Sequence, residues 1–187
     1  MSTSPNKTLD LVYIALGAVL IAVCSWISIP MAVPFTMQTF AVFAVCAILG
    51  GRRGTLSVII YILLGVAGLP VFSGFTGGVG VLLGNTGGYI IGFIFTALVM
   101  WAGEKLFGIG LIPSVIAMLV GLAVCYLFGT IWFIQVYTST KGSIGVMAVL
   151  GWCVIPFILP DLVKITLAVI LSRRLRPLIN RGTTVSA

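Results

Sequence analysis

The chain has 187 residues, of which 60% are hydrophobic and only 7% charged, and its net charge is +7. Its mean hydropathy is +1.29. This composition provides far more apolar surface than one water-soluble core can bury, so it excludes an ordinary soluble domain and predicts an all-α, multi-pass protein of the cell membrane. The length accommodates about six or seven spans of about 20 residues each and leaves no room for a separate soluble domain.

Charge-free runs and turn residues divide the chain into six predicted spans. The first is expected at 9–29, and its charge-free part, 11–29, is longer than the apolar region of a signal peptide, so we expect it to be retained. Pro30 and Pro34 separate it from the second span, because proline lacks a backbone donor and disfavours helix before its ring. The other spans are expected at 35–50, 55–69, 86–103, 109–137 and 157–173, all within a single transmembrane domain covering 1–187.

The distribution of basic residues predicts the orientation, because short cytoplasmic loops are enriched in lysine and arginine. With six spans, only Lys141 falls on the outer side. The basic residues that fall on the opposite side are Lys7, Arg52, Arg53, Lys105, Arg173, Arg174, Arg176 and Arg181. We therefore expect both termini in the cytoplasm, and we attribute the positive charge to topology rather than to a nucleic-acid partner.

Several classes of chemistry are poorly supported by the sequence. The chain has no histidine, and its four cysteines stand singly in apolar segments, which is typical of packing rather than of metal sites or disulfides. One carboxylate at membrane depth, without a nucleophile and an evident base, also argues against an intramembrane enzyme. We therefore expect no metal, no cofactor and no catalytic residues.

Asp161 and Lys164 lie three residues apart in a segment otherwise as apolar as a membrane span. Lys164 precedes Arg173 by nine residues, or about 13 Å of helix, so both charges are expected at membrane depth, where ionisable groups normally face a cavity or a partner. One interpretation is a mutual ion pair that only stabilises the bundle. Pro156 and Pro160 favour a ligand site in the outer half of the bundle, because interrupted helix at this depth chiefly lines cavities. Pro160 is expected in the first turn of a short final helix.

Residues 71–88 contain seven glycines and no charge. A phosphate-binding loop would need a G-K-[ST] signature, which is missing here. Glycines that only pack helices are one alternative; a loop folded back over a cavity, with close backbone approach to a ligand, is the other. In such a loop the polar groups would come from Ser73, Thr76, Asn85, Thr86 and Tyr89, and an apolar wall would come from Phe72 and Phe75.

A third polar cluster, Thr36, Gln38 and Thr39, opens the second predicted helix on the same outer side. Simple helix capping would explain this cluster as well as contact with a ligand would. The convergence of three polar elements on one face nevertheless favours a ligand pocket.

The first predicted helix carries small residues at a spacing of 3, 4 and 3, namely Ala15, Ala18, Ala22 and Ser25. Such a stripe lets two helices approach closely within lipid. It could serve packing within the chain or contact with a partner helix.

The motifs "PFTMQTF", "GLPVFSGFTGGVGVLLGNTGGYIIGF" and "PDLVKITLA" resemble those of the BioY family, the biotin-binding substrate components (S components) of energy-coupling-factor (ECF) vitamin importers. The resemblance covers nearly the whole chain. It implies six helices, high-affinity capture of biotin from outside, and assembly with a membrane coupling protein (the T component) and two ATPase subunits. It also implies that Ala15, Ala18 and Ala22 dock on the coupling protein. The ligand-binding residues that we predict are Asp161, Lys164, Asn85, Tyr89, Gln38, Thr36, Phe75, Gly77 and Gly78.

Biotin has a urea with two donors and one acceptor, an apolar sulfur ring and a carboxylate. Asp161 could accept the urea N–H groups, Asn85 with threonine or glutamine groups could satisfy the urea oxygen, and Lys164 could meet either the carboxylate or the urea oxygen. The spacing does not decide between these ends. The alternative function is a self-sufficient secondary transporter of a small organic anion or another vitamin, which would want a coupling-ion site and inverted repeats that the sequence does not display.

Overall fold

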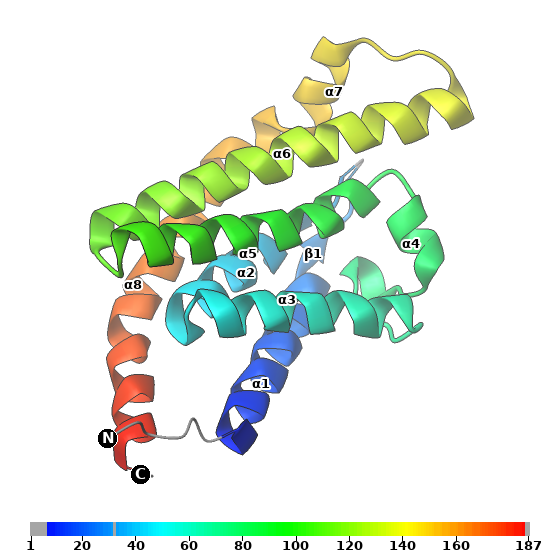
Figure 1. Ribbon diagram of the computed structural model, residues 1–187. Helices are drawn as coiled ribbons and strands as arrows, with labels where there is room; N and C mark the ends of the chain where they lie inside the picture. The colour runs from blue at the N-terminus through cyan, green and yellow to red at the C-terminus, as the bar shows by residue number, and fades with distance from the viewer. Residues whose placement is uncertain (1–6, 32, 186–187) are drawn as a thin grey trace.

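The computed structural model describes residues 7–31 and 33–185, with side chains up to residue 179, and shows a bundle of helices (Figure 1). The long helices are α1 (Lys7–Trp26), α2 (Gln38–Leu49), α3 (Gly51–Val66), α5 (Gly87–Phe107), α6 (Leu111–Lys141) and α8 (Ile155–Val185). The shorter helices are η1 (Ser73–Phe75), α4 (Val79–Leu83) and α7 (Val146–Cys153). Strands β1 (Ser28–Ile29) and β2 (Phe35–Thr36) form a small antiparallel hairpin between α1 and α2.

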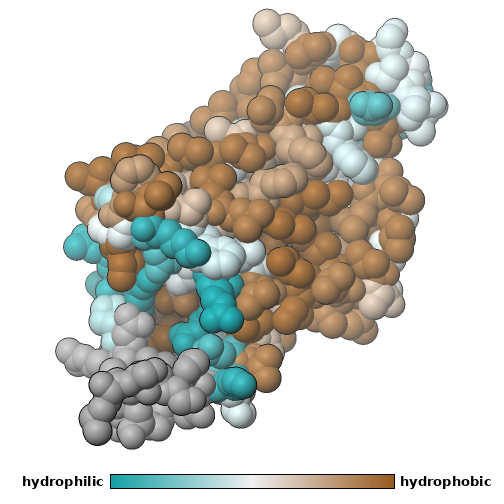
Figure 2. All heavy atoms as spheres, viewed as in Figure 1, coloured by the Kyte–Doolittle hydropathy of each residue, from teal (hydrophilic) through white to brown (hydrophobic). Residues whose placement is uncertain are grey.

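The described residues include four helical segments long and apolar enough to cross a membrane: α1, α5, α6, and α7 continued into α8. Helices α2 and α3 are shorter, with 12 and 16 residues. The surface is apolar over the middle of the molecule and hydrophilic at its two ends (Figure 2). The chain is therefore a multi-pass membrane protein.

Helix α2 lies at the centre of the bundle. Residues 41–48 are all buried, and α2 packs against α1, α3, α5 and α8. A helix that is hydrophobic on every side is expected in such an interior position. The short length of α2 follows from this position, because neighbouring helices rather than lipid cover it.

Helices α5 and α6 form a closely packed antiparallel pair (Figure 1). Small residues allow this approach, because a Cβ atom on Gly88 would lie 2.2 Å from the Cβ of Trp132, and one on Gly129 would lie 2.2 Å from the ring of Tyr89. Larger residues at either position would push the two helices apart. This packing holds Tyr89, which lines the cavity described below, in contact with α6.

Several helix boundaries differ from the sequence-based expectation. Gly50 alone, with φ of 86°, separates α2 from α3, so α3 begins at Gly51 instead of near residue 55. Helix α8 begins at Ile155, so Pro160 lies inside it and not in its first turn, as we had expected. Helix α8 also continues beyond 173, because leucine and arginine are good helix formers and a charge ends the apolar span without ending the helix.

The segment between α3 and α5 folds back onto α1 and α3. Trp26 donates its indole N–H to the carbonyl of Pro70 at 2.9 Å and stacks on Phe75, with ring centroids 5.0 Å apart. The amide of Gly78 donates to the carbonyl of Gly65 at 2.7 Å. Positive φ values at Gly68, Gly74 and Gly78 permit these tight turns. Several glycines therefore serve the internal folding of this segment.

Charged residues from distant parts of the sequence meet at one end of the molecule. Arg53 pairs with Asp10, and Arg176 pairs with Glu104. The start of α1 and the end of α8 also lie at this end, toward the lower left of Figure 1, where the hydrophilic surface gathers in Figure 2. Lys141, at the end of α6, lies at the opposite end (Figure 1).

The small-residue stripe of α1 faces mainly inward. Ala18, Ala22 and Ser25 are 2%, 7% and 0% exposed, whereas Ala15 is exposed. Ala18 and Ala22 therefore pack against other parts of the chain in this structure. This is one of the two roles that the spacing left open. The docking of Ala15, Ala18 and Ala22 on a coupling protein stays a prediction.

Candidate functional site

One cavity brings together the three polar clusters that the sequence places far apart. It is bordered by the start of α2 and the segment before it, by the glycine-rich segment, and by α5, α6, α7 and α8. Its lining residues are Val33, Pro34, Thr36, Gln38, Thr39, Ser73, Thr86, Tyr89, Ile90, Phe93, Cys125, Tyr126, Cys153, Phe157, Asp161 and Lys164. Mostly apolar walls with a few converging polar groups are typical of a small-molecule site.

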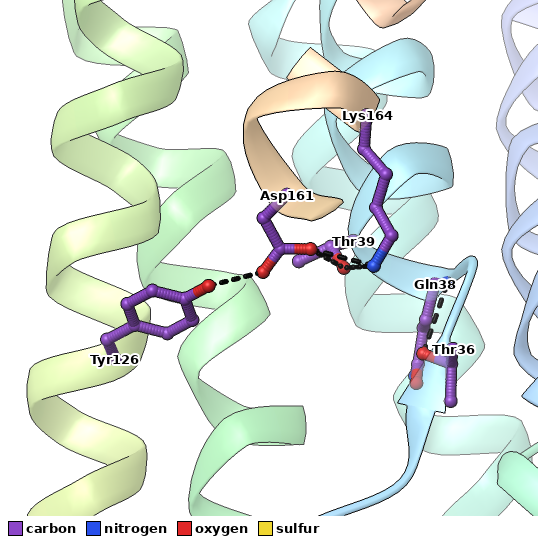
Figure 3. A network of polar contacts seen from close by, with 6 residues as sticks. All are labelled: Thr36, Gln38, Thr39, Tyr126, Asp161 and Lys164. Carbon is purple, nitrogen blue, oxygen red and sulfur yellow. Dashed lines mark hydrogen bonds and ion pairs between the residues drawn. The ribbon is translucent and has the colours of Figure 1, made fainter. Parts of the chain in front are cut away.

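Asp161 and Lys164 form a buried ion pair on α8, with 2.7 Å between Lys164 Nζ and Asp161 Oδ1 (Figure 3). Their side chains are only 3% and 4% exposed. They share one face because residues three apart in a helix are neighbours. Both charges also line the cavity, so the pair is accessible to a molecule bound there.

Two hydroxyl groups from other helices complete this network (Figure 3). Thr39 on α2 accepts a hydrogen bond from Lys164 Nζ at 3.1 Å and donates to Asp161 Oδ1 at 3.2 Å. Tyr126 on α6 donates to Asp161 Oδ2 at 2.5 Å. The network thus joins α2, α6 and α8 around one wall of the cavity.

The network leaves capacity for a ligand. An ionised carboxylate has about four lone-pair positions, and a lysine ammonium has three donors. The described contacts occupy three acceptor positions of Asp161 and two donors of Lys164. By this count one acceptor position on Oδ2 and one ammonium N–H stay available, on the two sides of the carboxylate (Figure 3). Together they match a ligand that offers a donor and an acceptor.

Aromatic rings stand next to these charges. Lys164 Nζ lies 4.3 Å from the ring centroid of Phe35, close enough for a cation–π interaction. Phe35 and Phe157 stack with their centroids 6.2 Å apart, and Phe157 lines the cavity. The charged corner therefore continues into an apolar surface that suits a nonpolar ring.

Two further walls carry neutral polar groups. Thr36 accepts a hydrogen bond from the backbone N–H of Gln38 at 3.2 Å. This bond is a local turn that precedes the helix, and it is not a helix cap, because Met37 is the N-cap residue of α2 and no side chain caps it. The Gln38 side chain donates to the Tyr61 hydroxyl at 2.6 Å. Between α5 and α6, the hydroxyls of Tyr89 and Thr130 are 3.2 Å apart.

The structure therefore brings five of the predicted ligand residues to one cavity, namely Thr36, Gln38, Tyr89, Asp161 and Lys164. It does not bring Phe75, Gly77, Gly78 or Asn85 to the cavity lining. Phe75 is 63% exposed and stacks on Trp26. Phe72, expected in an apolar wall, is 1% exposed and packs edge to face on Tyr61 in the core.

Sequence reasoning did not find Tyr126, which contacts Asp161 directly. Tyr126 stands alone in a long apolar helix, and a polar tip at membrane depth was the one available signal. Its distance from Asp161 depends on how α6 packs against α8. Within the described residues, no group of three or more histidine, cysteine, aspartate or glutamate side chains could hold a metal ion.

Comparisons with known proteins agree with this arrangement. A family model described as the BioY family matches residues 1–181. A probable biotin transporter BioY of Pyrococcus horikoshii is 39% identical over 171 residues, which cover 91% of this chain and 98% of that protein. The biotin transporter BioY of Thermotoga maritima is 41% identical over 163 residues, which cover 85% of this chain and 90% of that protein.

A solved structure is also similar. The crystal structure of the S-component for biotin from an ECF-type ABC transporter matches with a TM-score of 0.83 and 28% sequence identity, over 95% of each chain. The likeness therefore extends along the whole bundle. With the family model and the two relatives, it leads to one conclusion: this chain belongs to the BioY family.

Proposed function

We propose that the chain captures biotin for uptake, as the substrate-binding subunit of an ECF-type ABC transporter. The observation that carries the proposal is the buried Asp161–Lys164 pair facing a mostly apolar cavity, in a chain whose relatives are described as biotin transporters. Biotin enters as the transported ligand, and the proposal requires no cofactor.

The chemistry of the cavity suits both ends of biotin. The free acceptor position of Asp161 would take a urea N–H. The remaining N–H of Lys164 would donate either to the urea oxygen beside it or to the carboxylate. The aromatic and aliphatic walls, including Phe93 and Phe157, would cover the sulfur ring. Phe75, Gly77, Gly78 and Asn85 would contact the ligand only if the glycine-rich segment moved toward the cavity, which it already borders through Ser73 and Thr86.

The proposed membrane arrangement has six transmembrane helices, with α2 and α3 as the two short ones. Both termini lie in the cytoplasm, since the basic end of the molecule is expected on the cytoplasmic side. Lys164 is about 13 Å along α8 from Arg173. This depth is near the middle of a hydrocarbon core about 30 Å thick. The cavity extends from there to Ser73 and Thr86, between the end of α3 and the start of α5, so the proposed site opens into the outer half of the bundle, where it can receive the vitamin from outside.

The partners in this proposal are the lipid bilayer, a membrane coupling protein and two ATPase subunits. The part of the α1 stripe that is exposed for a partner helix is Ala15. Ala18 and Ala22 would support docking indirectly, by holding α1 close to the rest of the bundle.

Calorimetry on the purified, detergent-solubilised chain tests the proposal. Biotin should bind, whereas thiamin and folate should not. Binding of another vitamin with no heat from biotin would overturn the assignment. Titrating Lys164→Met with biotin and with an analogue lacking the carboxylate identifies the ligand end at the ammonium. If Lys164 meets the carboxylate, the substitution weakens biotin binding far more than binding of the analogue.

Transport assays separate this function from a self-sufficient secondary transporter. Cells that express the chain together with the coupling protein and both ATPases should accumulate biotin. Cells in which the ATPases carry inactive nucleotide sites should not. Equal accumulation in both would contradict the role of a substrate-binding subunit and favour the secondary transporter.

A further inference from the structure

A second cavity lies toward the basic end of the molecule, between the turn that joins α5 to α6 and the later part of α8 (Figure 1). Its volume is about 460 Å³, which is within the range of small-molecule sites, about 300 to 1,000 Å³. It shares no lining residue with the cavity around Asp161 and Lys164. Its polar lining consists of Ser114, Ser172, Arg173 and Arg176, and we call it the basic cavity.

Arg173 brings to the basic cavity a positive charge that no acidic side chain neutralises. The chain has only three acidic residues. All three are already in ion pairs: Asp10 with Arg53, Glu104 with Arg176, and Asp161 with Lys164. Arg176 and Glu104 balance each other, so Arg173 leaves this region with one positive charge in excess. The missing counter-charge must come from outside the chain.

Several hydrogen-bond donors of the basic cavity are free to meet an anion. Within the described part of the chain, the Arg173 guanidinium and the Ser114 hydroxyl have no hydrogen-bond partner. Arg176 uses only two of its five N–H groups, toward Glu104 and the carbonyl oxygen of Ala47. Arg173 and Arg176 are three residues apart and therefore neighbours on α8. Guanidinium groups in such a position suit the planar, bidentate recognition of a phosphate.

The apolar part of the lining indicates that this phosphate belongs to a lipid. Ile109, Leu111 and Val169 line the same cavity, and Ile109 and Leu111 are 59% and 45% exposed. Arg173 is the first charged residue after the apolar run 165–172 of α8, so it marks the level at which a span passes from hydrocarbon to headgroups. A free phosphate ion would leave the exposed apolar side chains uncovered, whereas the acyl chains of a lipid would cover them.

We propose that the basic cavity binds the phosphate of an anionic phospholipid from the cytoplasmic leaflet. Arg173 and Arg176 hold the phosphate, and Ser114 donates to it. One phosphodiester carries one negative charge, which matches the one excess positive charge. A zwitterionic headgroup would add an ammonium group, and no acidic residue is among the described residues of the lining. The inference uses the membrane orientation of the proposed function, because anionic lipids are characteristic of the cytoplasmic surface, but it does not depend on biotin.

The competing explanation is that Arg173 serves only to orient the chain in the membrane. Its neighbour Arg174 is exposed and carries the same charge at the same depth, but it does not line the basic cavity. An orienting role, or general attraction to an anionic membrane, would use both arginines equally. A lipid site needs Arg173 far more than Arg174, so the two substitutions decide between the explanations.

The first test measures the unfolding temperature of the full-length protein in neutral detergent. Phosphatidylglycerol, phosphatidylcholine or inorganic phosphate is added at the same concentration. Phosphatidylglycerol should raise the unfolding temperature, because a ligand that binds only the folded state stabilises it, and the other two should not. An equal rise with inorganic phosphate would indicate a plain anion site. An equal rise with phosphatidylcholine would indicate a general lipid effect, and either result would overturn the inference.

The second test compares Arg173→Gln with Arg174→Gln, its matched control. Native mass spectrometry measures the affinity for phosphatidylglycerol. Arg173→Gln should weaken binding roughly 10-fold or more, the effect of one charge-assisted hydrogen bond, whereas Arg174→Gln should change it little. Biotin affinity should be unchanged in both, since neither residue lines the ligand cavity. Equal losses in the two variants, or no loss in Arg173→Gln, would overturn the inference.

Ser114→Ala keeps the inference testable if Arg173→Gln does not fold. It removes one neutral donor and should weaken phosphatidylglycerol binding roughly 2- to 12-fold; unchanged binding would overturn the inference. Failure of the unsubstituted protein to bind biotin would instead contradict the proposed function, so the two failures are distinguishable.

Discussion

Helix α8 makes two ion pairs that differ in what they connect and in how they are buried. Asp161–Lys164 lies within the helix itself, and its side chains are 3% and 4% exposed. Arg176–Glu104 joins α8 to α5, with side chains 19% and 28% exposed. Arg176 also bonds the carbonyl oxygen of Ala47, and Glu104 accepts from the backbone N–H of Gly51. The second pair therefore ties the ends of four helices together.

A stabilising role explains the Arg176–Glu104 pair better than it explains the Asp161–Lys164 pair. A partly exposed pair between helices loses little hydration and holds distant elements in place, although such pairs contribute only about 0 to 1 kcal/mol. A pair buried within one helix is strongly dehydrated, and the bond between its charges connects no separate elements. Burial of such a pair is weak evidence for stability. Its position on the cavity wall instead favours ligand binding as the reason for Asp161 and Lys164.

Asp161→Asn should have the largest effect in this comparison. The substitution removes the charged acceptor, and loss of a hydrogen bond to a charged group is worth about 1.5 to 3 kcal/mol, or roughly 10- to 150-fold in biotin affinity. Calorimetry measures the affinity, and thermal unfolding in detergent shows whether the fold persists. A protein that binds biotin normally until it unfolds would make this pair structural, like Arg176–Glu104.

Ala18→Leu changes a buried core position that belongs to neither ion pair, and it tests stability separately from ligand binding. Because Ala18 is 2% exposed, three extra carbon atoms must displace neighbours, and overpacking of this kind costs about 1 to 3 kcal/mol of stability. The unfolding temperature should fall, while the biotin affinity of the folded fraction stays unchanged. Ala15→Leu, at the exposed position of the same stripe, is the matched control and should unfold like the original protein. Equal stability of both variants would contradict the inward orientation of Ala18.

Tyr126→Phe tests the uncharged hydroxyl group that donates a hydrogen bond to Asp161. The change removes the hydroxyl that donates to Asp161 Oδ2 but keeps the ring. Asp161 would then be less firmly oriented, and biotin affinity should fall roughly 2- to 12-fold, as for one ordinary hydrogen bond. Tyr13→Phe provides a control on α1, where the ring lies 5.4 Å from the Arg53 guanidinium and outside the cavity. Identical affinities for the two variants would remove Tyr126 from the site.

Glu104→Gln should have the smallest effect. The amide oxygen can still accept from Gly51, but the amide NH2 group then faces Arg176, so the ion pair and its hydrogen bond are lost. Because this pair is partly exposed, the free energy of unfolding should fall by only about 1 kcal/mol. Biotin affinity should not change, because Glu104 does not line the ligand cavity. The stability difference should also shrink at high salt, which screens partly exposed charges. A large loss of affinity would show that the two ends of the bundle are coupled.

The sequence alone was enough to establish the membrane character, the family, and the presence of two charges within an apolar helix. These properties are local, because a long apolar run or an i, i+3 pair retains its meaning wherever its helix packs. The sequence also predicted Thr36, Gln38 and Tyr89 as site residues, because polar residues near the ends of apolar helices are easily recognised.

Which of these groups lie in contact depends on how the helices pack in three dimensions. The side of α1 that faces inward, and with it the role of Ala18, depends on the rotation of that helix against its neighbours. The contact of Tyr126 with Asp161 depends on the packing of α6 against α8, and the stacking of Phe75 on Trp26 depends on how a glycine-rich segment turns. Helical periodicity gives each helix a face but not the neighbour of that face, because lipid and protein interior are similarly apolar.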